Sequence, residues 1–76
     1  MSADNEFKPY CVFKAVKEVW LTPRTVYLIH SPMNYNTAIE LEEWYRARGI
    51  NTYRLNTGVE EDRIFAEQLI QAVCYE

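Results

Sequence analysis

Glycine is scarce in this sequence, and its scarcity excludes one class of site. The chain has 2 glycines among 76 residues, and neither Gly49 nor Gly58 lies in a glycine-rich loop. Loops that cradle nucleotide phosphates need several closely spaced glycines, because the backbone must approach the phosphate. The sequence therefore lacks a nucleotide-loop motif. A chain of this length forms one domain, since a second core could not be filled.

Cysteines and long apolar runs are few as well. Cys11 and Cys74 form no C-x-x-C pair, so the sequence predicts no metal site built on cysteine. No apolar run approaches the roughly 18 residues that a membrane span requires, and the opening MSADNEF lacks the order of a signal peptide. We therefore expect a cytoplasmic protein in a reducing compartment, with no membrane partner.

Basic residues are too few and too scattered to indicate a nucleic-acid partner. The chain has 8 basic and 11 acidic residues, for a net charge of -3. Nucleic-acid binders gain affinity by neutralising phosphates and need a basic patch. The acidic groups at 40–43 and 60–62 fit solvated helix surfaces, or alternatively an acidic face turned toward a basic partner. No histidine joins Glu40 and Glu43, so no metal or other cofactor is expected.

The chain does contain alternating helical and strand patterns. Residues 1–8 are polar and predict a flexible tail, and residues 9–76 form the single domain. From Tyr10 to Leu21 the apolar residues recur at helical spacing, which predicts an amphipathic helix. A strand is the alternative for this segment, because its residues also alternate and are β-formers. Thr22-Pro23 ends the element in either case.

Four further elements follow, each with a start or stop signal in the sequence. They are a strand over 25–30, a helix over 37–48 that ends at Gly49, a strand over 50–56, and a helix from 57 onwards. Both helices open on an apparent capping box, T-A-I-E and T-G-V-E. The two tryptophans, Trp20 and Trp44, are predicted to fill the core.

The expected order is therefore helix-strand-helix-strand-helix, which is an α/β fold. The two strands and the helix between them predict a right-handed parallel unit. Two strands are too few for a stable sheet. We therefore expect the exposed edge to pair with a second copy of the chain, giving a homodimer, or with another protein.

Polar residues gather after the two predicted strands. Ligands of open α/β sheets bind beyond the carboxyl ends of the strands, where these side chains should converge. They are His30, Ser31, Asn34, Asn36 and Asn56.

The motifs LIHSPM and NYNTAIELEEWYRARGINTYRLN also carry a family resemblance. The stretch from Val26 to Asn56 resembles the opening unit of nucleoside 2-deoxyribosyltransferase-like proteins, in which a strand ends in an Ala-Gly-Pro-Met turn and an R-x-x-G segment leads into the second strand. The resemblance implies a nucleoside or nucleotide near His30 to Met33. Here His30 and Ser31 replace the family's alanine and glycine, and no segment corresponds to the one that carries its acidic nucleophile.

His30 is the only histidine and the obvious candidate for a general base. A base needs a nucleophile within hydrogen-bond reach. Ser31 follows it directly on the strand and so points to the opposite face. We expect the ring nitrogens of His30 to be hydrogen-bonded at the strand end, and we predict no catalytic residues and no enzymatic activity.

Apolar residues that fall off the predicted core stripes indicate protein-docking surfaces, because interfaces favour tyrosine and arginine around apolar centres. The predicted protein-binding residues are Tyr35, Ile39, Glu42 and Arg46 on one helix, and Ile64, Gln68 and Tyr75 on the other.

Two functional hypotheses follow. The first is a small non-enzymatic module that inhibits or adapts another protein by docking on it. Its size, acidity and aromatic content resemble those of the accessory proteins that phages and mobile elements use against host machinery. The second is a nucleotide- or nucleoside-binding module that uses the turn from His30 to Asn36.

Overall fold

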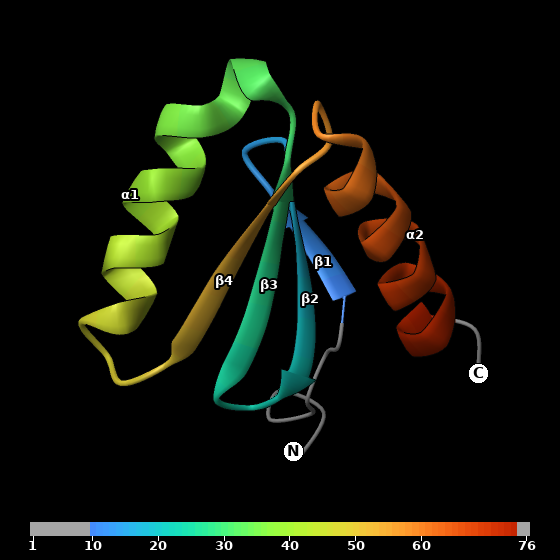
Figure 1. Cartoon of the computed structure of the whole chain (residues 1–76). Coiled ribbons are helices and arrows are strands. Elements are labelled where there is room, and N and C mark those ends of the chain that lie inside the picture. Colours follow the sequence, from blue (N-terminus) through green and yellow to red (C-terminus); the bar gives the residue numbers. More distant parts are fainter. Residues whose placement is uncertain (1–9, 75–76) are drawn as a thin grey trace.

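The computed structural model describes residues 10–74, which form a four-stranded sheet with one helix on each face (Figure 1). The predicted tail at residues 1–8 lies outside these residues. The strands are β1 (Tyr10–Phe13), β2 (Val16–Thr22), β3 (Thr25–His30) and β4 (Asn51–Asn56). A short 3-10 turn, η2 (Pro32–Asn34), leads into helix α1 (Tyr35–Arg46), and helix α2 (Glu60–Cys74) follows β4.

The strands lie in the order β1-β2-β3-β4. The pairs β1–β2 and β2–β3 are antiparallel, and β3–β4 is parallel with Thr25 opposite Asn51 and His30 opposite Asn56. The predicted parallel unit is therefore confirmed, with α1 as its crossover. The molecule is a small mixed α/β domain.

Residues 10–21 form a β-hairpin, so the helix predicted there is wrong. Phe13 pairs with Val16, and the chain reverses at Lys14 and Ala15, whose φ angles are 52° and 67°. A two-residue loop with both φ angles positive is a type I′ turn, which matches the twist of the strands but usually takes asparagine or glycine. The β-branched and aromatic residues of the segment favour strands, and this preference outweighed their helical spacing. The strand alternative was right in type, although the segment forms two strands.

The element order is therefore strand-strand-strand-helix-strand-helix, and the sheet has four strands rather than two. Four strands reach the usual size of a stable sheet. The predicted homodimer was derived from a sheet with too few strands, so that reason for it no longer holds.

Each face of the sheet buries its own apolar cluster, because successive strand residues point to opposite faces. The cluster under α1 contains Val16, Val26, Leu28 and Ala38, and the cluster under α2 contains Val19, Ile29, Leu55 and Ala66. The sheet is thus the middle of three layers, which explains why β3 is apolar along almost its whole length.

The helices begin at different residues than the capping boxes indicated. α1 starts at Tyr35, two residues before Thr37, and its N-cap Asn34 makes no side-chain capping bond. α2 begins at Glu60, three residues after Thr57. The Thr57 backbone N–H donates to the His30 carbonyl at 2.8 Å. The predicted stop at Gly49 is confirmed, since its φ of 82° is a conformation that glycine adopts readily.

The two helices cover the sheet unequally. α1 packs mainly on β3 and β4, whereas α2 crosses the opposite face and contacts β1, β2 and β4 (Figure 1). The outer strands of a four-stranded sheet lie about 15 Å apart, and a helix with its side chains is only about 10 Å wide. α1 therefore covers β2 only in part, where Val16 and Glu18 are buried, and leaves β1 uncovered on this face, where Phe13 is 47% exposed.

Candidate functional site

The part of the sheet face that α1 leaves uncovered forms a groove between the β1–β2 hairpin and α1. Its volume is about 600 Å³, and more of its lining surface is apolar than polar. We call it the β1–α1 groove. Its lining residues are Cys11, Val12, Phe13, Lys14, Glu18, Thr37, Glu40, Leu41, Trp44 and Tyr45.

Glu18 on β2 lies in the floor of the β1–α1 groove and is only 3% exposed. Its Oε1 accepts hydrogen bonds from Trp20 Nε1 at 3.2 Å and from Cys11 Sγ at 3.2 Å. The Tyr45 hydroxyl from α1 lies 2.9 Å from both Oε1 and Oε2. Three donors from three different elements therefore hold one buried carboxyl group, and the Tyr45 bond ties α1 to the sheet.

The environment of Tyr45 keeps its hydroxyl protonated. Burial raises the pKa of this phenol well above its ordinary value, and the hydrogen bond to Glu18 and the negative charge of Glu18 raise it further. A phenol with a raised pKa remains a donor across the physiological pH range. The Tyr45 hydroxyl therefore remains a donor to Glu18 at neutral pH.

The walls of the groove expose large apolar side chains. Phe13 from β1 is 47% exposed and Trp44 from α1 is 51% exposed. The prediction that Trp44 fills the core is thus wrong, whereas Trp20 is partly buried in the cluster under α1. The Arg48 guanidinium lies 3.5 Å from the centroid of the Trp44 ring, which keeps the indole flanked on one side. The Trp44 ring also meets Tyr45 edge-on at 5.3 Å.

A second, smaller cavity lies at the carboxyl ends of the parallel strands. His30 is 1% exposed, and its Nδ1 lies 2.9 Å from the Ser31 carbonyl oxygen. Because a carbonyl only accepts, Nδ1 carries the proton, and Nε2 is left as a buried acceptor with no hydrogen-bond partner among residues 10–74. The expectation that both ring nitrogens are hydrogen-bonded is therefore wrong for Nε2.

We call this space, of about 280 Å³, the His30 cavity. It is lined by polar side chains from α1, β3, β4 and α2, namely His30, Glu42, Arg46, Thr52, Tyr53, Arg54, Asn56 and Asp62. Of the ligand-binding residues predicted from sequence, only His30 and Asn56 line it. Asn34 donates to Ser31 Oγ at 3.0 Å within the turn, and Asn36 is exposed.

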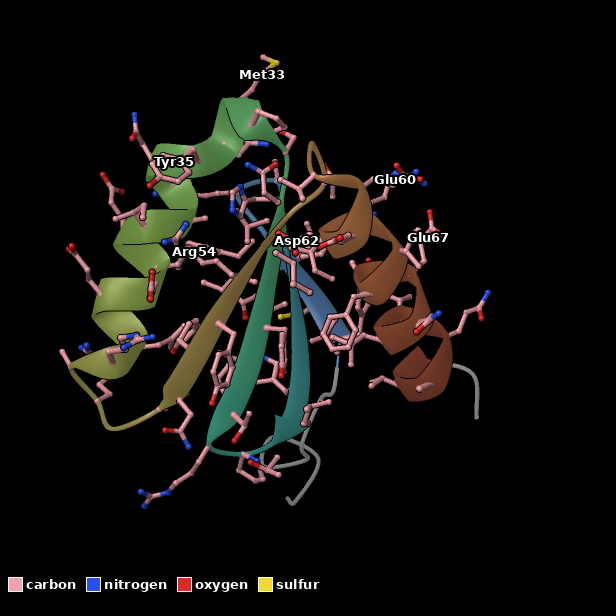
Figure 2. All side chains as sticks on the ribbon, in the orientation of Figure 1. Met33, Tyr35, Arg54, Glu60, Asp62 and Glu67 are labelled. Atoms are coloured by element: carbon pink, nitrogen blue, oxygen red, sulfur yellow. The ribbon has the colours of Figure 1, made fainter. Side chains whose placement is uncertain are left out.

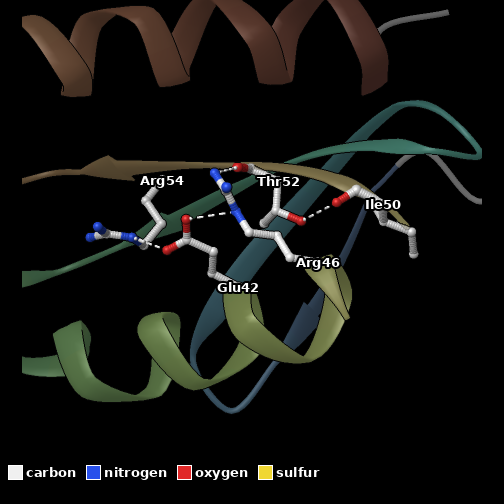
Figure 3. Close-up of polar contacts among 5 residues, drawn as sticks. All are labelled: Glu42, Arg46, Ile50, Thr52 and Arg54. Carbon is white, nitrogen blue, oxygen red and sulfur yellow. Dashed lines mark hydrogen bonds and ion pairs between the residues drawn. The ribbon is translucent and has the colours of Figure 1, made fainter. Parts of the chain in front are cut away.

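Glu42 organises the α1 side of the His30 cavity (Figure 3). Its Oε1 lies 2.6 Å from Arg54 Nε and its Oε2 lies 3.0 Å from Arg46 Nε. Arg46 Nη2 also donates to the Thr52 carbonyl of β4 at 2.9 Å. Glu42 and Arg46 therefore brace α1 against the outer edge of β4.

The structure separates the predicted protein-docking residues into two places. Tyr35 is exposed and lies beside Arg54 on the α1 side, with 5.3 Å between the guanidinium and the ring centroid (Figure 2). Ile39 is half-buried rather than exposed. Ile64 and Gln68 are exposed on α2, on the opposite side of the sheet. Tyr75 lies outside the described residues. The two sets do not form one surface.

The β1–α1 groove was missed from the sequence for a definite reason. A helix over 10–21 would have placed Val12 and Phe13 in a core and Glu18 on a solvated face. The available signal was the alternation through Val16, Glu18 and Trp20, which puts a carboxylate in line with two apolar side chains on one strand face. A glutamate in that position indicates a buried polar contact.

Comparison with known proteins gives no match to a family model, to a curated protein or to a solved structure. Within residues 10–74, neither helix has the length and apolar character needed to cross a membrane. The same residues bring together no group of three or more side chains of the types that ligate metals.

Proposed function

We propose that this chain is a small non-enzymatic protein-binding module that inhibits or adapts its partner, and that it docks through the β1–α1 groove. One observation carries the proposal. Exposed apolar side chains from β1 and from α1 converge on a single concave surface, although the rest of the α1 face is covered. Such a surface suits a partner segment that inserts apolar side chains between two walls.

Trp44 is the anchor of this proposed interface. Tryptophan is the residue type most enriched among interface positions that dominate binding energy. Its indole is half exposed, yet it is oriented by contacts with Arg48 and Tyr45. A partner can therefore bury the exposed part of the ring at little further cost in side-chain entropy.

Peptides selected from a random displayed library against the immobilised protein test the proposal. Trp44→Ala is expected to weaken their binding by at least about tenfold, because truncation of an anchoring tryptophan typically costs more than 1.4 kcal/mol. Its melting temperature should remain close to that of the parent. Ile64→Ala, at a position on α2 that is 43% exposed, is the control and should leave affinity unchanged. The reverse pattern would place docking on α2 and contradict the proposal.

The buried Nε2 of His30 favours a second candidate function, the binding of a small molecule in the His30 cavity. A buried acceptor without a donor costs free energy that a ligand hydroxyl or amine would recover. The family resemblance makes nucleosides the first ligands to test, although only His30 and Asn56 of the predicted set face this space.

Thermal shift measurements with a panel of nucleosides separate this candidate from the first. A ligand present at about 100 times its dissociation constant should raise the melting temperature by several degrees. His30→Asn keeps a donor near the Ser31 carbonyl but removes Nε2, and it should abolish the shift. If no nucleoside shifts the melting temperature of the parent protein, this candidate is removed.

A further inference from the structure

Glu18 has an acceptor position that the described residues do not use. Its three donors supply one hydrogen each, from Cys11, Trp20 and Tyr45, and all three lie within reach of Oε1. Among residues 10–74, Oε2 is approached only by the Tyr45 hydroxyl, whose single hydrogen it shares with Oε1. A carboxylate offers about four acceptor sites, so Oε2 keeps capacity for another donor.

Glu18 also has no positive partner within the described chain. The ion pairs among residues 10–74 involve Glu42 and Glu67, and no lysine or arginine pairs with Glu18. A buried carboxylate without a cation bears a desolvation cost that its neutral donors offset only in part. A cation that entered the groove would therefore gain more from Glu18 than from an exposed glutamate.

The remaining charges of the β1–α1 groove add to this preference. Glu40 gives a second negative charge in the lining, against the single positive charge of Lys14. The Lys14 Nζ is held 5.4 Å from the centroid of the Phe13 ring, at the hairpin turn. The whole chain carries a net charge of -3. The long-range field therefore attracts a basic partner and disfavours a second copy of the same chain.

We propose that the β1–α1 groove recognises a basic segment of another protein by accepting a lysine side chain, whose ammonium group donates to Oε2 of Glu18. This inference rests on the proposed docking function and specifies the partner's chemistry. Lysine fits better than arginine, because Oε1 is already occupied and the paired donors of a guanidinium require both oxygens. The apolar stem of lysine can lie along Leu41 and Trp44 while only its tip reaches the floor.

The test uses lysine-bearing peptides from the selection described above, each compared with the same peptide carrying Nε-acetyllysine. Acetylation removes the charge and keeps the stem. It should weaken binding to the parent protein by about tenfold or more, as expected for loss of a charged contact in a buried setting. In Glu18→Gln the two forms should bind equally. In Glu40→Gln, acetylation should still weaken binding as it does in the parent protein. This variant leaves the hydrogen bonds of the buried Glu18 unchanged.

The outcomes distinguish the two proposals. If Trp44→Ala weakens binding but acetylation does not, the groove is a docking site and the lysine assignment is wrong. If acetylation weakens binding equally in the parent and in Glu18→Gln, the cation pairs elsewhere and the assignment is again wrong. If Trp44→Ala has no effect, both proposals fail. Light scattering tests for a second copy of the chain. A rise to twice the monomer mass at higher protein concentration, abolished in Glu18→Gln, would show a second copy in the groove and contradict the proposal of a basic partner.

Discussion

Replacing Tyr45 with phenylalanine should lower the free energy of unfolding by about 2 kcal/mol, because the change removes a hydrogen bond to a buried charged group. Within the described part of the chain, Tyr45 supplies the only donor that reaches Oε2 of Glu18, and its hydrogen bond links α1 to β2. For a domain of this size the loss corresponds to a fall of about 10 °C in melting temperature. Thermal unfolding followed by circular dichroism measures it.

Tyr53→Phe is the matched control, because it removes the same hydroxyl from a tyrosine on the sheet. Tyr53 is about half exposed and stacks on Tyr27 at 4.9 Å, and its hydroxyl makes no hydrogen bond to the described residues. Its free energy of unfolding should change by less than about 0.5 kcal/mol. Equal losses in the two variants would show that Tyr45 does not hold Glu18 in the way described.

The largest expected loss of stability follows from Leu28→Ala. Leu28 lies at the centre of β3 with no exposed surface and packs in the cluster under α1. Truncation of a fully buried leucine removes apolar contacts and leaves a cavity, which together cost about 3 kcal/mol. Small domains are stable by only about 5 kcal/mol or somewhat more, so this variant should be close to unfolding at 37 °C.

Leu21→Ala provides the comparison for Leu28→Ala. Leu21 is 44% exposed and lies in β2 where the pairing with β3 shifts its register. Its loss should be under about 1 kcal/mol. Urea denaturation measures both variants, and the midpoint should fall strongly for Leu28→Ala with an unchanged slope. Similar midpoints for the two variants would contradict the assignment of Leu28 to the core.

The parallel part of the fold could be predicted from the sequence, and the hairpin could not. The apolar run of β3, the break at Pro32 and the stop at Gly49 are local signals, and each produced the element it indicated. The hairpin reverses at Lys14 and Ala15, residues that rarely adopt positive φ. Without a glycine or asparagine at the turn, the sequence contained no visible stop between β1 and β2.

The candidate site was hidden by the same error. Trp44 was assigned to the core because a tryptophan on a small domain is usually buried. It is exposed because α1 lies mainly over β3 and β4, and the side of the helix that carries Trp44 borders the β1–α1 groove. Coverage of a sheet depends on tertiary packing, which periodicity along one helix does not reveal.

The hydrogen-bond partners of the polar side chains could not be predicted from the sequence either. The sequence placed His30 correctly at the end of a strand. That Nε2 has no partner among residues 10–74 depends on how closely β4 and α1 surround the ring. Likewise, Glu42 and Arg46 were predicted to contact a partner protein. Within the chain their side chains bond to each other and to β4, an arrangement that follows from how the helix lies over that strand.

The central claim is that partners dock in the β1–α1 groove, and chemical-shift mapping tests it most directly. The ¹⁵N-labelled protein is titrated with a selected lysine-bearing peptide. We predict that the perturbed backbone amides cluster in residues 11–14 and 37–45, and that the indole N–H of Trp20 shifts because it donates to Glu18. Perturbations confined to α2 around Ile64, or to the His30 cavity, with the Trp20 indole unchanged, would contradict the account.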